Sequence, residues 1–249
     1  MGNPAGNGLG VDLTVCDDAT AMGAAAAAWL RERVSATPDL VLGAPAGRSP
    51  RPMYRALEAL QATAPVDFSR LTVFAVDDLS APAPADGVVW RQVRRDLLSW
   101  AGPPPARCHA FTLDAPDLHA MCRAYEAAIA AAGGLDLVIP GLGPNGHLGG
   151  NEPGSAFDSR TRPVDLAETS VRYFLSDSIN AGCPCGTGCV TLGLGTVMDA
   201  REVLLLAAGP LKRAPLRRLL EGPASVDLPA SVLRGHPRCR ILADHAAAT

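Results

Sequence analysis

The chain has 249 residues, of which 48% are hydrophobic and 19% are charged. This composition excludes bulk disorder, which requires few hydrophobic residues and a high net charge. With 22 basic and 25 acidic residues the formal net charge is −3, so the chain lacks the basic surplus that binds nucleic-acid backbones. We therefore expect no nucleic-acid partner.

Membrane insertion and export are also disfavoured by the first part of the chain. Its longest early apolar stretch covers residues 24–30 and ends at Arg31, far short of the roughly 20 residues that cross a bilayer. A signal peptide has a basic segment followed by an apolar one, and the residues after Met1 do not show this pattern. We expect no membrane partner and a cytoplasmic location.

Short apolar runs alternate with longer segments of helical periodicity along the chain. The predicted strands are residues 11–16, 40–44, 71–76, 109–112, 135–140, 203–208 and 239–243. The predicted helices are residues 21–35, 50–62, 88–100, 118–132 and 212–220. This order predicts an α/β fold: a doubly wound, mostly parallel, Rossmann-like sheet with helices on both faces, in three layers. The 25 Gly and 22 Pro are scattered, so no linker is indicated and we expect one domain over residues 1–249.

In doubly wound folds, ligands bind beyond the carboxyl ends of the strands. The loop after the second predicted strand contains Gly47, Arg48 and Ser49 and leads through Pro50 into a helix. Backbone N–H groups and the positive end of the helix dipole at such a turn favour an anion such as phosphate. An ordinary turn that needs Gly for its backbone and Pro for helix entry is the alternative.

Two adjacent carboxylates, Asp77 and Asp78, follow the third predicted strand. A carboxyl group that is partly removed from water can have a pKa near neutrality and transfer protons. An acidic residue at a strand end can equally cap the next helix. Both interpretations remain open from the residues alone.

The loop after the fifth predicted strand is the richest in functional side chains. Gly141, Gly143 and Gly146 fit the pattern GxGxxG, but Gly149, Gly150 and Pro153 break the helix that a dinucleotide fingerprint must open. We reject a dinucleotide site. The same loop carries His147 and Glu152, an imidazole and a carboxylate suited to general acid–base chemistry.

Lysine and cysteine add two weaker signals. Lys212 is the single lysine in the sequence and follows the sixth predicted strand, where a compact ammonium could bind a phosphate. The alternative is that one lysine is present at this position by chance. Cys183, Cys185 and Cys189 crowd a Gly-rich loop. No fourth ligand of recognisable spacing is present, so free thiols are favoured over zinc and we expect no metal.

Taken together and in order, these motifs resemble the glucosamine-6-phosphate deaminase family and, more distantly, the 6-phosphogluconolactonases. The resemblance runs through residues 42–50, 74–78, 136–147, 151–153, 159–162 and 193–199. Asn151-Glu152-Pro153 favours the deaminase branch. The resemblance implies cofactor-free chemistry on a small-molecule phosphorylated amino sugar, and leaves a homo-oligomer open.

The resemblance also implies roles for particular residues. His147 would help to open the pyranose ring, Asp77 would move a proton between C2 and C1, and Glu152 would support the histidine. The phosphate site would comprise Gly47, Arg48, Ser49, Arg172 and Lys212. Asp78 and Gly143 are further expected to contact the substrate.

Three positions depart from the family pattern. Asn145 stands where the family has an aspartate, and an amide can orient an imidazole but cannot stabilise its cation. Asp78 and Leu79 replace a glutamate and a tyrosine.

The predicted activity is aldose–ketose isomerisation of an amino-sugar 6-phosphate, with loss of ammonia if the amine is on C2. Isomerisation of another aminohexose phosphate without ammonia release, a phosphosugar lactonase and a non-catalytic sugar-phosphate sensor are the alternatives.

Overall fold

The computed structural model describes residues 11–249. Within them, seven strands form a sheet in which every neighbouring pair is parallel. In spatial order the strands are β1 (Val11–Cys16), β10 (Cys239–Asp244), β9 (Glu202–Ala207), β6 (Leu137–Val138), β2 (Val41–Ala44), β3 (Thr72–Ala75) and β5 (Cys108–His109). The predicted parallel α/β class is confirmed.

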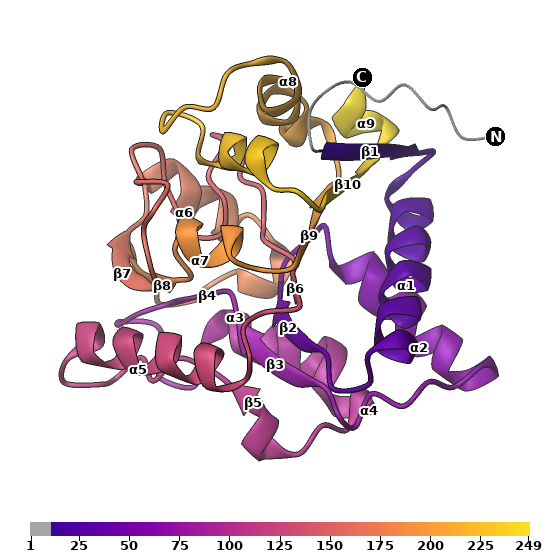
Figure 1. Cartoon of the computed structure of the whole chain (residues 1–249). Coiled ribbons are helices and arrows are strands. Elements are labelled where there is room, and N and C mark those ends of the chain that lie inside the picture. Colours follow the sequence, from indigo (N-terminus) through magenta and orange to yellow (C-terminus); the bar gives the residue numbers. More distant parts are fainter. Residues whose placement is uncertain (1–10) are drawn as a thin grey trace.

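Helices cover both faces of this sheet. In Figure 1, α1 (Ala19–Ala36) and α2 (Arg51–Thr63) lie to its right, and α5 (Leu118–Ala131), α6 (Glu168–Leu175) and α7 (Leu194–Met198) lie to its left. α8 (Arg213–Glu221) and α9 (His245–Ala248) lie near the end of the sheet that β1 occupies. No helix in this part of the chain has both the length and the apolar character that crossing a membrane requires.

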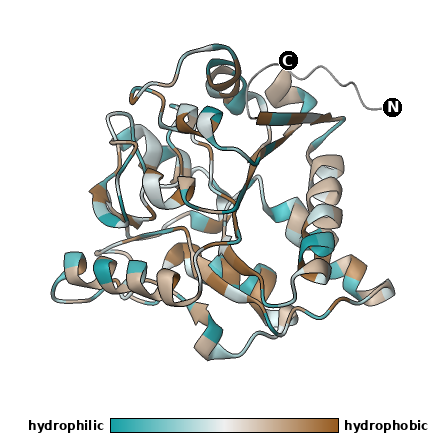
Figure 2. Cartoon of the chain, viewed as in Figure 1, coloured by the Kyte–Doolittle hydropathy of each residue, from teal (hydrophilic) through white to brown (hydrophobic). Residues whose placement is uncertain are grey.

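Burial explains why these segments adopt their structures. β9 buries five of its six residues, as strands covered on both faces do, and Figure 2 shows hydrophobic residues concentrated on the strands of the larger sheet. α1 buries Met22, Leu30 and Val34. It begins at Asp18, whose side chain accepts a hydrogen bond from the N–H of Ala21 at 2.8 Å, a common helix N-cap.

A second, smaller sheet was not predicted. Its antiparallel strands lie in the order β4 (Asp77–Leu79), β8 (Gly188–Thr191) and β7 (Arg162–Asp165). The strands have only three or four residues, which is too short for a period-two pattern to be recognised. Asp77 and Asp78 therefore lie in a strand, and not in the loop that we expected.

Several predicted boundaries also need correction. The strand expected at 109–112 is β5 at Cys108–His109. The helix expected at 88–100 consists of α3 (Val88–Val93), a π-helical segment (Arg94–Leu98) and α4 (Ser99–Ala101). The helix expected from residue 212 is α8, which begins at residue 213 after a 3₁₀ turn (Pro210–Lys212).

The strand order determines where a ligand can bind. After β2 the chain continues to β3 on one side, whereas after the adjacent β6 it continues, through the smaller sheet, to β9 on the other. The loops that leave β2 and β6 therefore diverge and leave a crevice between them at the carboxyl ends of the strands. Residues 45–50 and 139–147 lie in these loops.

Candidate active site

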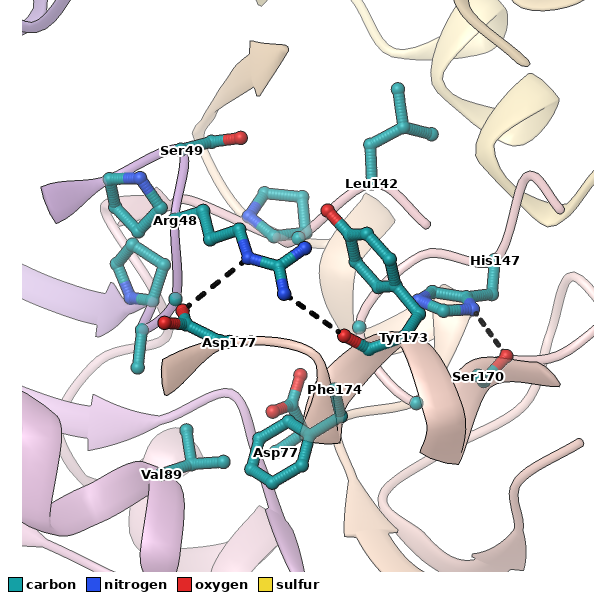
Figure 3. Close-up of a pocket in the computed structure, with 18 of the residues that line it drawn as sticks. Arg48, Ser49, Asp77, Val89, Leu142, His147, Ser170, Tyr173, Phe174 and Asp177 are labelled. Atoms are coloured by element: carbon teal, nitrogen blue, oxygen red, sulfur yellow. Dashed lines mark hydrogen bonds and ion pairs between the residues drawn. The ribbon is translucent and has the colours of Figure 1, made fainter. Parts of the chain in front are cut away.

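A pocket occupies this crevice and brings together most of the predicted site. Figure 3 shows side chains from the β2 loop, from β4, from the β6 loop and from α6 converging on it. The predicted residues that line it are Gly47, Arg48, Ser49, Asp77, Asp78, His147 and Lys212. These residues span more than 160 positions of sequence, so only the tertiary fold joins them.

The carboxyl group of Asp77 faces this pocket without a hydrogen-bond partner among residues 11–249. Burial, with the charge of Asp78 as a smaller contribution, raises the pKa of Asp77 to about 7. Gly149 leaves room for it, since a Cβ added there would lie 3.3 Å from Asp77 Oδ2. A carboxyl group with a pKa near the working pH is suited to accept and return a proton.

Asp78 has a structural role. Its side chain is 2% exposed, and its two oxygens accept hydrogen bonds from the backbone N–H groups of Leu79, Val88, Val89 and Trp90 at 2.8 to 2.9 Å. The carboxyl thus caps the first turn of α3. The expected substrate contact needs correction: Asp78 borders the pocket, but its oxygens are occupied by the helix.

His147 lies in a hydrogen-bonded network. Its Nδ1 is 3.2 Å from Ser170 Oγ and 3.6 Å from Glu152 Oε1. The Asn145 amide donates to Glu152 Oε2 at 2.6 Å, and Asn145 Oδ1 accepts from the backbone N–H of His147 at 3.1 Å. The network joins all three predicted side chains and fixes the orientation of the imidazole.

Glu152 supplies the negative charge of this network. Burial opposes its ionisation, but hydrogen bonds with His147, Ser170 and Asn145 and the charge of His147 outweigh burial and lower the pKa of Glu152 to about 2. The carboxylate is therefore ionised at neutral pH, beside a group that can take up a proton.

Gly143 supports the imidazole and does not line the pocket. A Cβ added at Gly143 would lie 2.2 Å from Cε1 and Nε2 of His147, so the ring packs directly against the Gly143 backbone. The expected contact between Gly143 and substrate therefore needs correction, because the His147 ring occupies the space over this residue.

Two cations meet over one aromatic ring that lines the pocket. The Arg48 guanidinium lies 4.6 Å and the Lys212 ammonium 4.3 Å from the centre of the Tyr173 ring. Arg48 also bonds Ser176 Oγ at 2.7 Å and lies 3.6 Å from Asp177. Burial, reinforced by the charge of Arg48, lowers the pKa of Lys212 to about 7. An anion between these cations would relieve their mutual repulsion.

The β2 loop adds backbone donors beside these cations. Gly47 has φ +106°, a conformation that favours glycine, and the space around its Cα is open. Ser49 precedes the N-terminus of α2, where N–H groups attract anions. The structure thus brings together in one pocket four of the residues that were predicted to form a phosphate cradle: Gly47, Arg48, Ser49 and Lys212.

Arg172 does not join this cradle. Its side chain is 69% exposed and pairs with Glu168 at 3.1 Å. Ser170, Tyr173 and Phe174 of the same helix line the pocket, and a helix that turns them inward turns residue 172 toward solvent. The expected phosphate contact of Arg172 is therefore corrected.

Sequence reasoning missed Ser170 and Tyr173. Their spacing of three residues places them on one face of α6, but α6 itself was not predicted. An eight-residue helix carries little periodic signal, so the only pointer to these residues in the sequence was their position beside Arg172.

The three loop cysteines are free thiols in the structure. Cys189 lies buried in β8 and lines the pocket, whereas Cys183 and Cys185 are half-buried before that strand. Within residues 11–249 no group of three His, Cys, Asp or Glu side chains is placed to hold a metal ion.

Comparisons with known proteins agree with this geometry. Residues 17–241 match the model of the family described as glucosamine-6-phosphate isomerases/6-phosphogluconolactonase. The chain belongs to this family. A glucosamine-6-phosphate deaminase of Pseudarthrobacter chlorophenolicus is 41% identical over 96% of this chain and 92% of its own. Glucosamine-6-phosphate deaminase 2 of Bacillus subtilis is 34% identical over 89% and 90%, respectively.

Solved structures of the family have the same fold. A monomeric glucosamine-6-phosphate deaminase superposes with a TM-score of 0.86 at 32% identity, covering 95% of this chain and 98% of its own. A 6-phosphogluconolactonase of Trypanosoma brucei superposes with a TM-score of 0.75 at 22% identity, covering 96% and 98%, a likeness that concerns the fold alone.

Proposed function

We propose that this chain converts glucosamine 6-phosphate into fructose 6-phosphate and ammonia without a cofactor. The observation that carries the proposal is a free carboxyl group, Asp77, with a pKa of about 7, in one pocket with an imidazole–carboxylate network and two cations. The names of the family members described above support the same reaction.

The phosphate would bind first and orient the sugar. Gly47 and Ser49 offer backbone donors, and Arg48 and Lys212 offer positive charge. A substrate that is held at its phosphate presents its reacting carbons in a fixed position, which lowers the entropic part of the barrier.

His147 would then open the ring, and Asp77 would move the proton. The imidazole, supported by Glu152, delivers a proton to the ring oxygen as the C1 hydroxyl loses one, which gives the open aldehyde. Asp77 takes the proton from C2, and the electron pair of that bond forms the C1=C2 double bond of an enolamine while the substrate ammonium passes a proton to the carbonyl oxygen on C1. Return of the proton to C1 leaves an imine at C2. Water adds to the imine, and ammonia leaves to give the ketone.

These reaction steps balance without an external oxidant or reductant. C1 is reduced from aldehyde to alcohol while C2 is oxidised to the level of a ketone, and the proton that leaves C2 returns to C1. The only other reactant is the water that replaces ammonia. One carboxyl group with a tuned pKa is therefore sufficient for the central step.

A panel of aminohexose 6-phosphates tests the proposal. The purified chain is incubated with glucosamine 6-phosphate and with isomers that carry the amine at other positions, while ammonia and ketose are measured separately. Equal amounts of both products from glucosamine 6-phosphate are expected. Ketose without ammonia from another isomer would contradict the deaminase assignment, and hydrolysis of 6-phosphogluconolactone alone would contradict isomerisation.

We also propose a cytoplasmic location and leave a homo-oligomer as a prediction. All seven cysteines are free thiols, as is usual in a reducing compartment. Cell fractionation tests the location. Light scattering of the purified chain tests the oligomeric state, for which the similar solved deaminase is monomeric.

A further inference from the structure

Ser170 lies at the centre of the network around His147, and the reaction steps above do not use it. This serine belongs to α6, is 5% exposed and lines the pocket. Its Oγ lies 3.2 Å from Nδ1 of His147, accepts a hydrogen bond from Nδ2 of Asn145 at 3.4 Å and bonds the Glu152 carboxylate. A hydroxyl has one proton to donate and two lone pairs that accept. The neighbours of Ser170 therefore determine where its proton lies.

The backbone of His147 fixes the orientation of the Asn145 amide. Asn145 Oδ1 accepts a hydrogen bond from the backbone N–H of His147 at 3.1 Å. Rotating the amide would set its NH₂ group against this N–H, and two donors cannot bond each other. Nδ2 of Asn145 therefore faces Glu152 and Ser170. Because the amide oxygen is already bonded to the backbone, an acceptor for a proton on Nδ1 of His147 must come from another residue.

The same reasoning places the hydroxyl proton of Ser170. Glu152 has a pKa of about 2, so it is ionised at neutral pH, and an ionised carboxylate only accepts hydrogen bonds. Ser170 therefore donates its proton to Glu152 and presents its lone pairs to Asn145 and His147. Nδ1 of His147 then carries the proton of its bond to Ser170. Glu152 Oε1, 3.6 Å from Nδ1, also stabilises a proton there through its negative charge.

The other ring nitrogen of His147 is open to the pocket. Nε2 has no hydrogen-bond partner among residues 11–249, and it is not one of the fully buried unpaired atoms of that part of the chain. In Figure 3 the bond to Ser170 leaves the ring on the side away from Arg48 and Tyr173. A neutral imidazole that is protonated on Nδ1 offers a lone pair on Nε2, so Nε2 can accept a proton from a ligand in the pocket.

We propose that Ser170 is a positioning residue, whose hydroxyl accepts the Nδ1 proton of His147 and so keeps Nε2 free to act as a base toward the sugar. This inference rests on the proposed function, and it assigns the first step of ring opening. Nε2 takes the proton of the C1 hydroxyl, and the electron pair left on that oxygen forms the C1 carbonyl. The bond from C1 to the ring oxygen breaks with its electron pair on the ring oxygen, which receives the proton from Nε2.

The ¹⁵N NMR spectrum of the histidine side chains tests the tautomer directly. The chain is labelled at its five histidines, and the signals of His147 are identified by their absence from His147→Gln. A pH series observes the neutral ring. We expect Nε2 of neutral His147 to have the chemical shift of an unprotonated ring nitrogen and Nδ1 that of a protonated one. The opposite assignment would mean that Ser170 donates to Nδ1, and it would overturn the inference even in a chain without turnover.

Two substitutions at Ser170 link the tautomer to turnover of glucosamine 6-phosphate. Ser170→Ala removes the acceptor, so the neutral ring should populate both tautomers. Its kcat should fall about tenfold or more, because a histidine in the wrong tautomer loses its function even where the geometry is intact. KM should stay close to that of the unmodified chain, since uniform binding of the substrate is not affected. Ser170→Thr retains the hydroxyl and should restore both the Nδ1-protonated form and most of kcat.

Thr169→Ala is the matched control. It removes a hydroxyl from the same helix, but the side chain of Thr169 is exposed, so this variant should match the unmodified chain in both the NMR signals of His147 and kcat.

The outcomes separate the inference from the proposed function. If Ser170→Ala leaves the NMR signals of His147 unmoved, the inference is overturned while the proposed function stands, whether or not kcat falls. If Ser170→Ala does not fold, the spectrum of the unmodified chain still decides the tautomer. An unmodified chain that has the expected tautomer but does not act on glucosamine 6-phosphate refutes the proposed function, and the role of Nε2 in ring opening with it.

Discussion

At the scale of single residues, Asp77 combines the proposed chemistry with a cost in stability. The pKa of about 7 means that the folded chain retains a proton on Asp77 that the unfolded chain, with a pKa near 3.9, has released. Between about pH 4 and 7 the folded state thus binds more protons, so its stability falls as the pH rises through this window. Above about pH 7 the folded state carries the full free-energy cost of ionising Asp77.

Asp77→Asn should therefore abolish turnover and stabilise the fold. Each pKa unit corresponds to about 1.4 kcal/mol, but the carboxyl borders an open pocket, so we expect roughly half of the full value, about 2 kcal/mol, at pH 8. For a chain of this size that is about 5 °C in Tm. Calorimetry at pH 8 and pH 4 measures this increase in Tm, which should nearly vanish at pH 4. Retained turnover would refute the assigned role.

The pKa of Lys212 predicts how kcat/KM falls on the alkaline side of its pH profile. Asp77 must be ionised and Lys212 protonated, and both have pKa values of about 7 in the free chain. The profile of kcat/KM, which reports the free enzyme, should be a narrow bell with its maximum near pH 7.

Replacing the ammonium tests this assignment. Lys212→Met should raise KM by about tenfold or more and remove the descending limb of the bell, while the ascending limb of Asp77 remains. A descending limb that persists in Lys212→Met would assign it to another group.

At the scale of elements, the cap of α3 determines where Asp77 and Gln92 lie. Four backbone N–H groups donate to Asp78, and Gly87 allows their approach, since a Cβ at this position would lie 2.2 Å from Asp78 Oδ2. Because Asp78 adjoins Asp77 and α3 carries Gln92, one buried carboxylate positions two parts of the pocket.

Asp78→Asn should destabilise the fold by about 3 kcal/mol, since an amide offers one acceptor oxygen and sets its NH₂ group against a backbone donor. Urea unfolding measures the loss. Asp86→Asn is the matched control from the same loop: its exposed pair with Arg91 should contribute nothing measurable. Equal effects of the two substitutions would contradict the capping role.

At the scale of the whole molecule, we expect residues 11–249 to unfold as one unit. One hydrophobic cluster contains residues from both ends of the larger sheet and from the helices on both faces. Trp29 lies in α1, and Trp90 and Trp100 lie in α3 and α4. Tryptophan fluorescence and far-UV circular dichroism should therefore give coincident transitions. Two separated transitions would indicate two domains.

The sequence revealed a large part of this fold because hydrophobic periodicity depends on local spacing alone. Five of the seven parallel strands and the longer helices α1, α2 and α5 were predicted close to their final bounds, whereas β5 and β6 have only two residues each and are shorter than predicted. The three short strands of the smaller sheet and α6 were not, because segments of three to eight residues carry too little periodic signal. For the same reason Ser170 and Tyr173 were not predicted, whereas the phosphate role of Arg172 came from the family resemblance alone.

What the sequence by itself determined is the parallel α/β class and the chemical types of the site: an acid after the third strand, an imidazole with a carboxylate in one loop, and cations at two strand ends. These follow from residue identity and spacing. Only the tertiary structure decided that Asp77 is free while Asp78 caps a helix, that Arg172 faces solvent, and that Gln92 and Asn180 pair with each other in the pocket wall. Burial and hydrogen-bond pairing depend on residues distant in the chain, and only folding brings those partners together.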